Sequence, residues 1–147
     1  MSVGYYEGGV YNNYWVLIFS YPENSHTEDY RQEVLNLVNA QRAKYGLTAL
    51  EMGDDALTAA AQTRAEEISV VNSHVRPDGS KCFTVLKDYG VTDTPTGENA
   101  AWGSVSPEEV VNAWMNSEGH RANILNPEAR KMSVGYYYNS NSTWGHQ

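Results

Sequence analysis

The sequence predicts an α+β fold with an antiparallel sheet, and three observations lead to that prediction. Residues with helical apolar spacing occupy the middle of the chain. Residue types that favour strands gather near its two ends. The hexapeptide MSVGYY occurs twice, at residues 1–6 and at residues 132–137. Helices in the middle and strands at the ends are typical of the α+β class.

The two copies of the hexapeptide continue differently along the chain. Both lead into turns rich in Gly, Asn and Ser, but only the first continues into a β-rich run, YWVLIF at residues 14–19. Residues 1–20 therefore predict a β-hairpin, which we expect to complete the sheet. Because a lone strand edge exposes unpaired backbone groups, we expect residues 14–19 to be the return strand for either copy, within one chain or between chains. The fold is predicted to be circularly permuted or strand-swapped, with a strand-exchanged oligomer as one expected state.

The remaining chain divides into a linker and a helical body. Residues 21–29 are polar and predict a linker, which leaves residues 30–147 as the body of the domain. Helices are expected from about residue 30 to Gly46, from a cap at Asp54 or Asp55 to about Ile68, from Ser80 to Gly90, and from a cap at Ser106 to a break at residues 118–119. A short extended stretch is expected at residues 98–102, a further helical turn at residues 120–125, and a closing strand after residue 127.

Composition excludes several classes of function. The 147 residues suit one domain, and the formal net charge of -8 argues against nucleic acid or an anionic membrane as a partner. No apolar run is long enough to span a membrane. Cys82 is the single cysteine, so an intrachain disulfide is excluded, and we interpret it as a small buried hydrophobic residue rather than a nucleophile. Residues 1–11 lack the features of a signal peptide, so either the protein is cytoplasmic or its leader is absent from this chain.

Four ordered motifs resemble those of the CAP superfamily, also called SCP-like, in its bacterial secreted form. They are SHVRPDG at residues 73–79, GENAAWG at residues 97–103, AWMNSEGHRANIL at residues 113–125, and the hairpin formed by VGYY at residues 3–6 with YWV at residues 14–16. The opening helix also fits the family. The resemblance covers residues 30–147 and the N-terminal hairpin. It implies a three-layer α-β-α sandwich with a central antiparallel sheet, an extracellular or cell-surface location, and a shallow polar cleft.

The chain departs from the family pattern in three places. Its closing hairpin lies at the N-terminal end, whereas the family normally carries it after the GHR motif. Glu118 stands where bacterial members often have proline. Ser117 stands where the eukaryotic branch has a second glutamate, so a four-residue site of that kind is incomplete here.

The resemblance brings His74, Glu98 and His120 from three separate elements into one cleft. Two imidazoles and a carboxylate can hold a divalent cation such as zinc, with an open position for water. The same residues can also act without metal, with Glu98 orienting a histidine that works as a base. Ser117 is the nearest nucleophile to His120 in sequence, although the chain has no G-x-S-x-G elbow.

Purely structural roles explain the same residues. His120 can close a helix end, Glu98 can cap the neighbouring helix, and His74 can hold its own loop. Arg121 and Asn123 are expected to brace backbone carbonyls rather than to touch a ligand.

Two functions therefore stay open at this point. The first is a binding module for a small amphipathic or peptide ligand. The second is a metal-dependent or Ser/His hydrolase acting on peptide or cell-envelope substrates. The sequence does not decide whether the protein is an enzyme.

Overall fold

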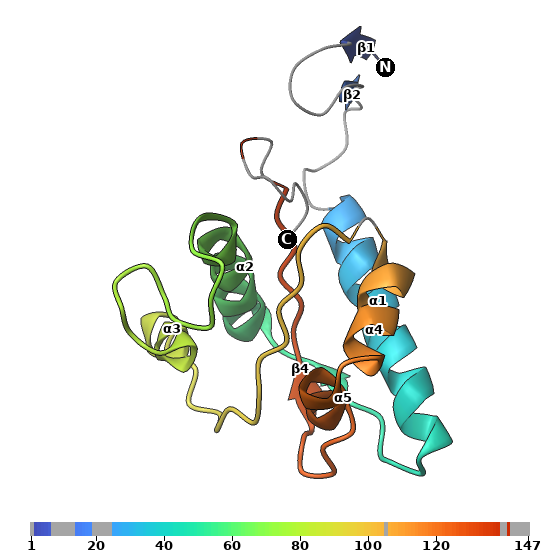
Figure 1. Ribbon diagram of the computed structural model, residues 1–147, viewed down its shortest axis with the longest axis vertical. Coiled ribbons are helices and arrows are strands. Elements are labelled where there is room, and N and C mark those ends of the chain that lie inside the picture. The colour runs from blue at the N-terminus through green and yellow to red at the C-terminus, as the bar shows by residue number, and fades with distance from the viewer. Residues whose placement is uncertain (1, 7–13, 19–24, 105, 139–140, 142–147) are drawn as a thin grey trace.

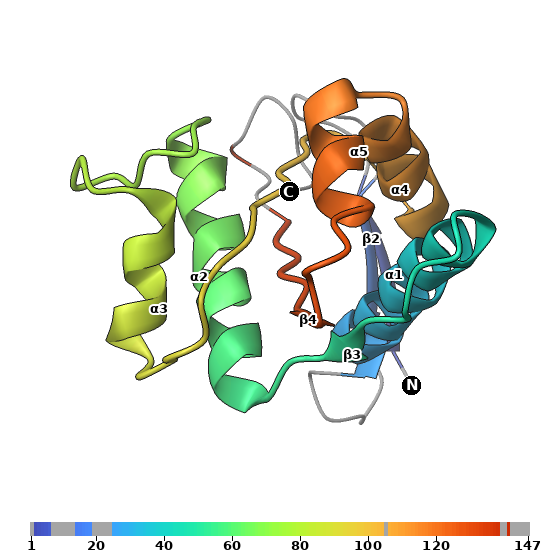
Figure 2. The ribbon, with the colours of Figure 1, turned by 90° about the horizontal axis from the view of Figure 1, so that it is seen from below.

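The helices of the protein lie on two sides of an extended C-terminal segment, residues 131–138 (Figures 1 and 2). The computed structural model describes residues 2–6, 14–18, 25–104, 106–138 and 141, with side chains from Tyr30 onward. Its elements are β1 (Ser2–Tyr6), β2 (Tyr14–Ile18), α1 (Ser25–Lys44), β3 (Glu51–Met52), α2 (Asp55–Val70), the 3-10 helix η1 (Cys82–Thr84), α3 (Val85–Asp88), α4 (Pro107–Met115), α5 (Glu118–Ile124) and β4 (Lys131–Met132). Helices α2 and α3 form one side, and α1, α4 and α5 form the other.

Local capping signals fix most helix ends where the sequence predicts them. The Asp54 carboxylate accepts a hydrogen bond of 2.9 Å from the Leu57 amide at the start of α2. Ser106 caps α4 in the same way, with Pro107 as the first helical residue. After α1, Gly46 takes a positive φ of 70°, a conformation that favours glycine. Helix α1 begins at Ser25, so part of the stretch predicted as a linker is helical.

The predicted break in the fourth helix lies at the wrong position. Helix α4 ends at Met115 and α5 begins at Glu118, because Ser117 takes an extended conformation between them. His120 consequently lies in the first turn of α5 and does not close a helix end, as one interpretation of the sequence proposed. The helix predicted from Ser80 is a 3-10 turn followed by the short α3.

The strands match the prediction only in part. Strands β1 and β2 pair antiparallel in a two-stranded sheet of their own, with Ser2 opposite Ile18. The helical body contains the two-residue strands β3 and β4, which pair parallel and not antiparallel as predicted. Parallel pairing is possible because, among the described elements, four α-helices and the 3-10 helix η1 lie between the two strands in the chain. The mixed class is confirmed, whereas the hairpin as the completion of this sheet stays a prediction.

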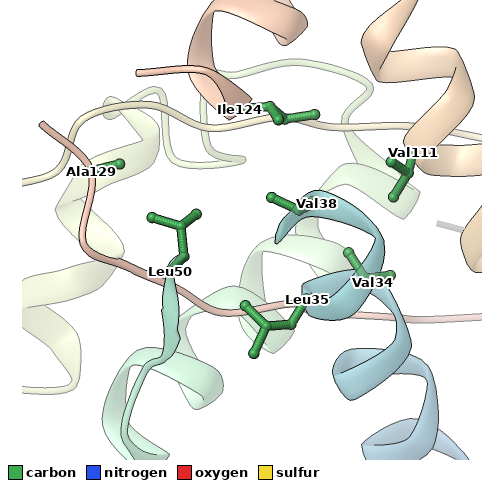
Figure 3. Packing of buried hydrophobic residues seen from close by; sticks show 7 residues of the cluster. All are labelled: Val34, Leu35, Val38, Leu50, Val111, Ile124 and Ala129. Atoms are coloured by element: carbon green, nitrogen blue, oxygen red, sulfur yellow. The ribbon is translucent and has the colours of Figure 1, made fainter. Parts of the chain in front are cut away.

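An apolar cluster holds α1 against α4 and α5 (Figure 3). Its buried members are Val34, Leu35, Val38, Leu50, Val111, Ile124 and Ala129. Burial of each of the larger side chains stabilises the fold by about 1.5–3 kcal/mol. Helix α5 is thereby fixed on the core, and with it the motif that contains His120. No helix in the described ranges is both long enough and apolar enough to cross a membrane.

Arg42 ties the end of α1 to the end of α5. Its side chain is 0% exposed and donates to the carbonyls of Thr48, Ile124 and Asn126, each at 2.8 Å. Burial, followed by the positive charge of Arg130, lowers the pKa of Arg42. The guanidinium donates to carbonyls at and just after the end of α5, where backbone carbonyls have no partner within the helix.

Candidate functional site

Glu98 is the centre of the polar site. It lies in the extended stretch before α4, and both of its carboxylate oxygens accept hydrogen bonds from Arg64 on α2. Arg64 Nε lies 2.9 Å from Oε2, and Arg64 Nη2 lies 3.1 Å from Oε1. This two-point pairing fixes the plane of the carboxylate. Arg64 is 6% exposed, so the pair is held largely away from water.

Arg64 reaches Glu98 because it lies on the buried stripe of α2. Ala60, Arg64 and Ile68 recur every four residues on the buried face of α2, beside the buried Ala65, and Arg64 is the charged member. A charge on an apolar stripe requires a buried partner. Arg64 was not predicted from the sequence, although that spacing was the signal for it.

A chain of alternating charges extends from Glu98 across α2 and α3. Arg64 also donates to Glu67 at 2.6 Å, and Glu67 accepts from Arg76 at 2.7 Å. Arg76 in turn pairs with Asp88 at 2.9 Å. We call these five residues the charge chain; no role for Arg64, Glu67 or Arg76 was predicted from the sequence.

The pKa values of the charge chain follow from these pairs. Burial alone would raise the pKa of Glu67, but Arg76 and Arg64 outweigh it and lower that pKa. Burial alone would lower the pKa of Arg64, but its bonds to Glu98 and Glu67 outweigh burial and raise it. Both residues are therefore ionised in the folded protein near neutral pH.

His74 presents an oriented imidazole to solvent. Its Nδ1 atom lies 2.8 Å from Glu98 Oε1, while its side chain is 54% exposed against 17% for that of Glu98. Where Nδ1–H donates this hydrogen bond to the carboxylate, Nε2 of a neutral ring is left as an acceptor. The loop is held by the Cys82 amide, which donates to the His74 carbonyl at 3.1 Å. The structure thus brings His74 and Glu98 together, and Glu98 does not act as a helix cap.

His120 is joined to this site through its backbone. The Asn99 side-chain amide donates to the His120 carbonyl at 3.0 Å, and Asn123 donates to Asn99 Oδ1 at 2.8 Å. Gly97 permits this approach, because a Cβ atom there would lie 2.5 Å from Asn123 Oδ1. Across the part of the chain that the structure describes, no hydrogen bond joins the His120 imidazole to His74 or Glu98.

The asparagine and the arginine of the GHR motif have the roles expected from the sequence. Arg121 donates to the Met115 carbonyl at 3.2 Å, and Asn123 lies 3.5 Å from the Glu98 carbonyl. Both side chains brace backbone carbonyls. They hold the two motifs in register and leave His74 as the exposed group of the site.

The three predicted ligands are not all grouped around one point among the described residues. Within the described ranges, no group of three or more His, Cys, Asp or Glu side chains is positioned to hold a metal ion. Both oxygens of Glu98 already accept hydrogen bonds from Arg64, so a cation there would compete with a guanidinium for the carboxylate. Ser117 forms no hydrogen bond to a histidine within the described ranges.

Cys82 behaves as the small buried residue expected from the sequence. It is 8% exposed, and burial followed by the negative charge of Glu98 raises the pKa of its thiol. A raised pKa keeps the thiol protonated and a poor nucleophile. The cysteine therefore contributes packing beneath the His74 loop.

Comparison with known proteins places the chain in a family. The model of CAP, the cysteine-rich secretory protein family, matches residues 35–144. The uncharacterized protein YkwD of Bacillus subtilis (strain 168) is 42% identical over 120 residues, which are 80% of this chain and 46% of YkwD. The uncharacterized membrane protein YlbC of the same strain is 33% identical over 115 residues, which are 75% of this chain and 33% of YlbC. The chain therefore spans less than half the length of these relatives.

Solved structures share the fold. An extracellular protein containing an SCP domain from Bacillus anthracis (strain Ames) has a TM-score of 0.71 and 25% identity, over 86% of this chain and 43% of that one. An outer surface protein of Borrelia burgdorferi has a TM-score of 0.65 and 24% identity, over 85% and 89% of the two chains. A cysteine-rich secretory protein of Staphylococcus aureus has a TM-score of 0.61 and 20% identity, over 76% and 36%. Together with the matched motifs, these comparisons show that the chain belongs to the CAP, or SCP-like, family of bacterial domains.

Proposed function

We propose that this CAP domain is an extracellular binding module, and that the imidazole of His74 is the polar contact for its ligand. The observation that supports the proposal is that burial decreases from one side chain to the next along a series of hydrogen bonds. Arg64 is buried, Glu98 is mostly buried, and His74 is exposed at the end of the series. A ring held in place before any ligand arrives loses less conformational freedom on binding.

The surroundings of His74 favour a ligand with apolar and polar parts. Val75 is the next residue of the loop and is 46% exposed, and Phe83 in η1 is 37% exposed. The bridge between Val75 and Lys81 and the bond from Cys82 to His74 connect the loop to η1. We expect a small amphipathic or peptide ligand to donate a hydrogen bond to Nε2 and to cover these apolar side chains.

The orientation of the His74 ring is the first test. Long-range nitrogen–proton NMR spectra of the imidazole should show the neutral ring protonated on Nδ1, with Nε2 unprotonated. Glu98→Gln should abolish this preference, because the amide no longer requires a donor on Nδ1. A ring protonated on Nε2 in the parent protein would contradict the proposal.

A library of blocked tripeptides, titrated into labelled protein, tests binding itself. Shifts should gather on the His74 loop and η1, and should be lost in His74→Ala. His26→Ala serves as the matched control for removal of a histidine. Shifts that persist in His74→Ala would place the ligand elsewhere, and a complete absence of shifts would count against a peptide-binding site.

A divalent cation remains part of this proposal only if Arg64 releases Glu98. Metal analysis after equilibration with zinc should be made on the parent protein, His74→Ala and His120→Ala. One zinc per chain that is lost in both variants would establish the cation site. No bound zinc in the parent protein would remove the cation from the proposal and leave the His74 hydrogen-bonding site in place.

Hydrolysis is the alternative function, because a carboxylate-oriented imidazole is also a competent general base. Such a reaction on peptide or cell-envelope substrates needs a nucleophile supplied by water or by the substrate. A hydrolase screen at neutral pH with Glu98→Gln as control separates the two functions. Turnover that falls at least tenfold in Glu98→Gln would favour the enzyme.

A further inference from the structure

One edge of the extended segment at residues 133–137 has no hydrogen-bonding partner among the described residues. The other edge is satisfied by side chains. Val134 O accepts from Arg31 at 2.8 Å, and Tyr136 both accepts from Gln62 at 2.8 Å and donates to it at 3.1 Å. Alternate residues of an extended chain direct their backbone groups to opposite edges. The backbone groups of the odd-numbered residues 133, 135 and 137 form no hydrogen bond within the described ranges, although these residues are half-buried.

Both faces of the segment are covered, so the unpaired edge is its remaining open side. Ser133 Oγ lies 3.2 Å from Thr58 Oγ1 on α2, and a Cβ atom on Gly135 would lie 2.0 Å from a backbone oxygen of α2. Val134 packs against the apolar cluster around α1. Such alternation between two helical layers is the environment of a strand in the middle of a sandwich.

A cavity of about 540 Å³ lies next to this segment. Its lining includes residues 132–136 and residues 97–101, with apolar side chains of α1 and α2. Half-buried backbone groups without partners are costly beside an apolar cavity. A strand in this space would satisfy the backbone edge and fill the apolar volume.

The chain contains a strand that already pairs with the sequence of this segment. Residues 1–6 and 132–137 are identical, and β2 pairs antiparallel with the first copy. Transfer of the observed register to the second copy gives the pairs Ser133 with Ile18, Val134 with Leu17, Gly135 with Val16, Tyr136 with Trp15 and Tyr137 with Tyr14. All five residues of β2 are apolar or aromatic, as the cavity requires.

We infer that β2 of a second copy of this chain docks on the open edge of residues 133–137 and enters the cavity in this register. The odd-numbered residues of the segment would then form the hydrogen-bonded pairs. We take β2 to dock through the same edge that it presents to β1, so it must leave β1 to dock. Docking therefore competes with the hairpin and depends on protein concentration.

The direction of α1 decides between a second copy and the same chain. Tyr30 contacts Tyr136 with ring centroids 5.4 Å apart, and the next helical residue, Arg31, reaches back to Val134. Helix α1 therefore runs antiparallel to the segment. A strand docked antiparallel to the segment runs in the same direction as α1.

The linker of the same chain is barely long enough for such docking. Ile18 would lie level with Ser133, whereas α1 begins at Ser25. The start of α1 and the position of Ser133 are about 17 Å apart along the direction of α1, counting about 1.5 Å per residue of helix and about 3.3 Å per residue of strand. Residues 19–24 span at most about 24 Å when fully extended, and they would also have to cross between layers. A second copy carries no such restriction.

Single-cysteine variants test the pairing directly. In a Cys82→Ser background, Leu17→Cys and Val134→Cys are prepared on chains of different tag length and mixed under mild oxidation. A non-hydrogen-bonded antiparallel pair has Cα atoms about 4.5 Å apart, which permits a disulfide. We expect a covalent heterodimer, and at least tenfold less of it when Val16→Cys, which faces the opposite side, replaces Leu17→Cys.

Three outcomes would overturn the inference. The first is the absence of a heterodimer in variants whose thermal unfolding matches that of the parent protein. The second is an equal yield with Val16→Cys. The third is an internal disulfide in a dilute Leu17→Cys/Val134→Cys double variant, which would assign β2 to its own chain.

The unmodified protein gives an independent test, should the variants fail to fold. Light scattering across a concentration series should show a rise in mass above one chain. A strict monomer throughout the series would overturn the inference. These results do not depend on His74 and leave the proposed binding function unaffected.

Discussion

The two helical layers of this domain are each organised around a buried arginine, but the partners of the two arginines differ. Arg42 donates to three backbone carbonyls that link α1 to the end of α5. Arg64 donates to the carboxylates of Glu98 and Glu67 on the α2 side. Carbonyls do not titrate, whereas carboxylates do. The bonds of Arg42 are therefore expected to be insensitive to pH. The Arg64 layer is held by ion pairs that respond to pH, and it ends at the solvent-exposed His74.

Loss of Arg42 should have the largest effect on stability. Arg42→Ala removes the donor of three backbone carbonyls, of which that of Ile124 is buried, and removes a large buried side chain, so we expect a loss of about 4 kcal/mol in the free energy of unfolding. Urea unfolding at neutral pH measures it. Arg42→Lys keeps the charge without the planar fork and should recover part of the loss. A loss below about 1 kcal/mol in Arg42→Ala would show that water replaces the guanidinium.

Loss of Arg64 should have the next largest effect and should depend on its carboxylates. Arg64→Met leaves the mostly buried Glu98 without its guanidinium and leaves Glu67 with Arg76 alone, and we expect a loss of about 3 kcal/mol. Addition of Glu98→Gln to this variant removes one unpaired charge and should restore part of the stability. If the double variant is no more stable than Arg64→Met, packing rather than charge governs the site.

Acid should weaken the α2 side selectively. The pKa of Glu67 is lower in the folded protein than its ordinary value of 4.5. Its contribution to stability is therefore fully present above that value and is lost as the pH falls through the lowered pKa. Amide hydrogen exchange at a series of pH values below 4.5 should show α2 and α3 losing protection before α1. Equal loss in both layers would remove the distinction between them.

Removal of His74 should have the smallest effect on stability. The ring is more than half exposed, and its bond to Glu98 is solvated, so His74→Ala should change the free energy of unfolding by less than about 0.5 kcal/mol. Urea unfolding beside Arg64→Met gives the comparison. A loss comparable to that of Arg64→Met would mean that the histidine supports the fold and is not reserved for a ligand.

The sequence predicted features that depend on neighbouring residues. Asp54 and Ser106 cap helices because a cap bonds to an amide three residues away. The motifs containing His74 and Glu98 were found because each is a short continuous string. Arg64 was missed because its partner Glu98 is 34 positions away, and nothing local identifies that pair.

The break between α4 and α5 shows the same limit at short range. The sequence placed it at residues 118–119, where Gly119 has the lowest helix propensity nearby. The structure places it at Ser117, where the chain turns extended to seat α5 on the core. Tertiary packing outweighed a preference of about 1 kcal/mol. The parallel pairing of β3 with β4 could not be predicted either, because it joins two-residue strands from distant parts of the chain.

The two copies of MSVGYY show which properties follow from the residues themselves and which depend on how the chain packs. Identical residues give both copies the same tendency to be extended and the same compatibility with β2. The first copy pairs in a hairpin, whereas the second lies between two helical layers with Arg31 and Gln62 on one edge. Local conformation follows from the residues themselves, because it depends on their own steric preferences and neighbours. The partner of a strand edge does not, because backbone hydrogen bonds are the same for every sequence and go to whichever group the packing brings within reach.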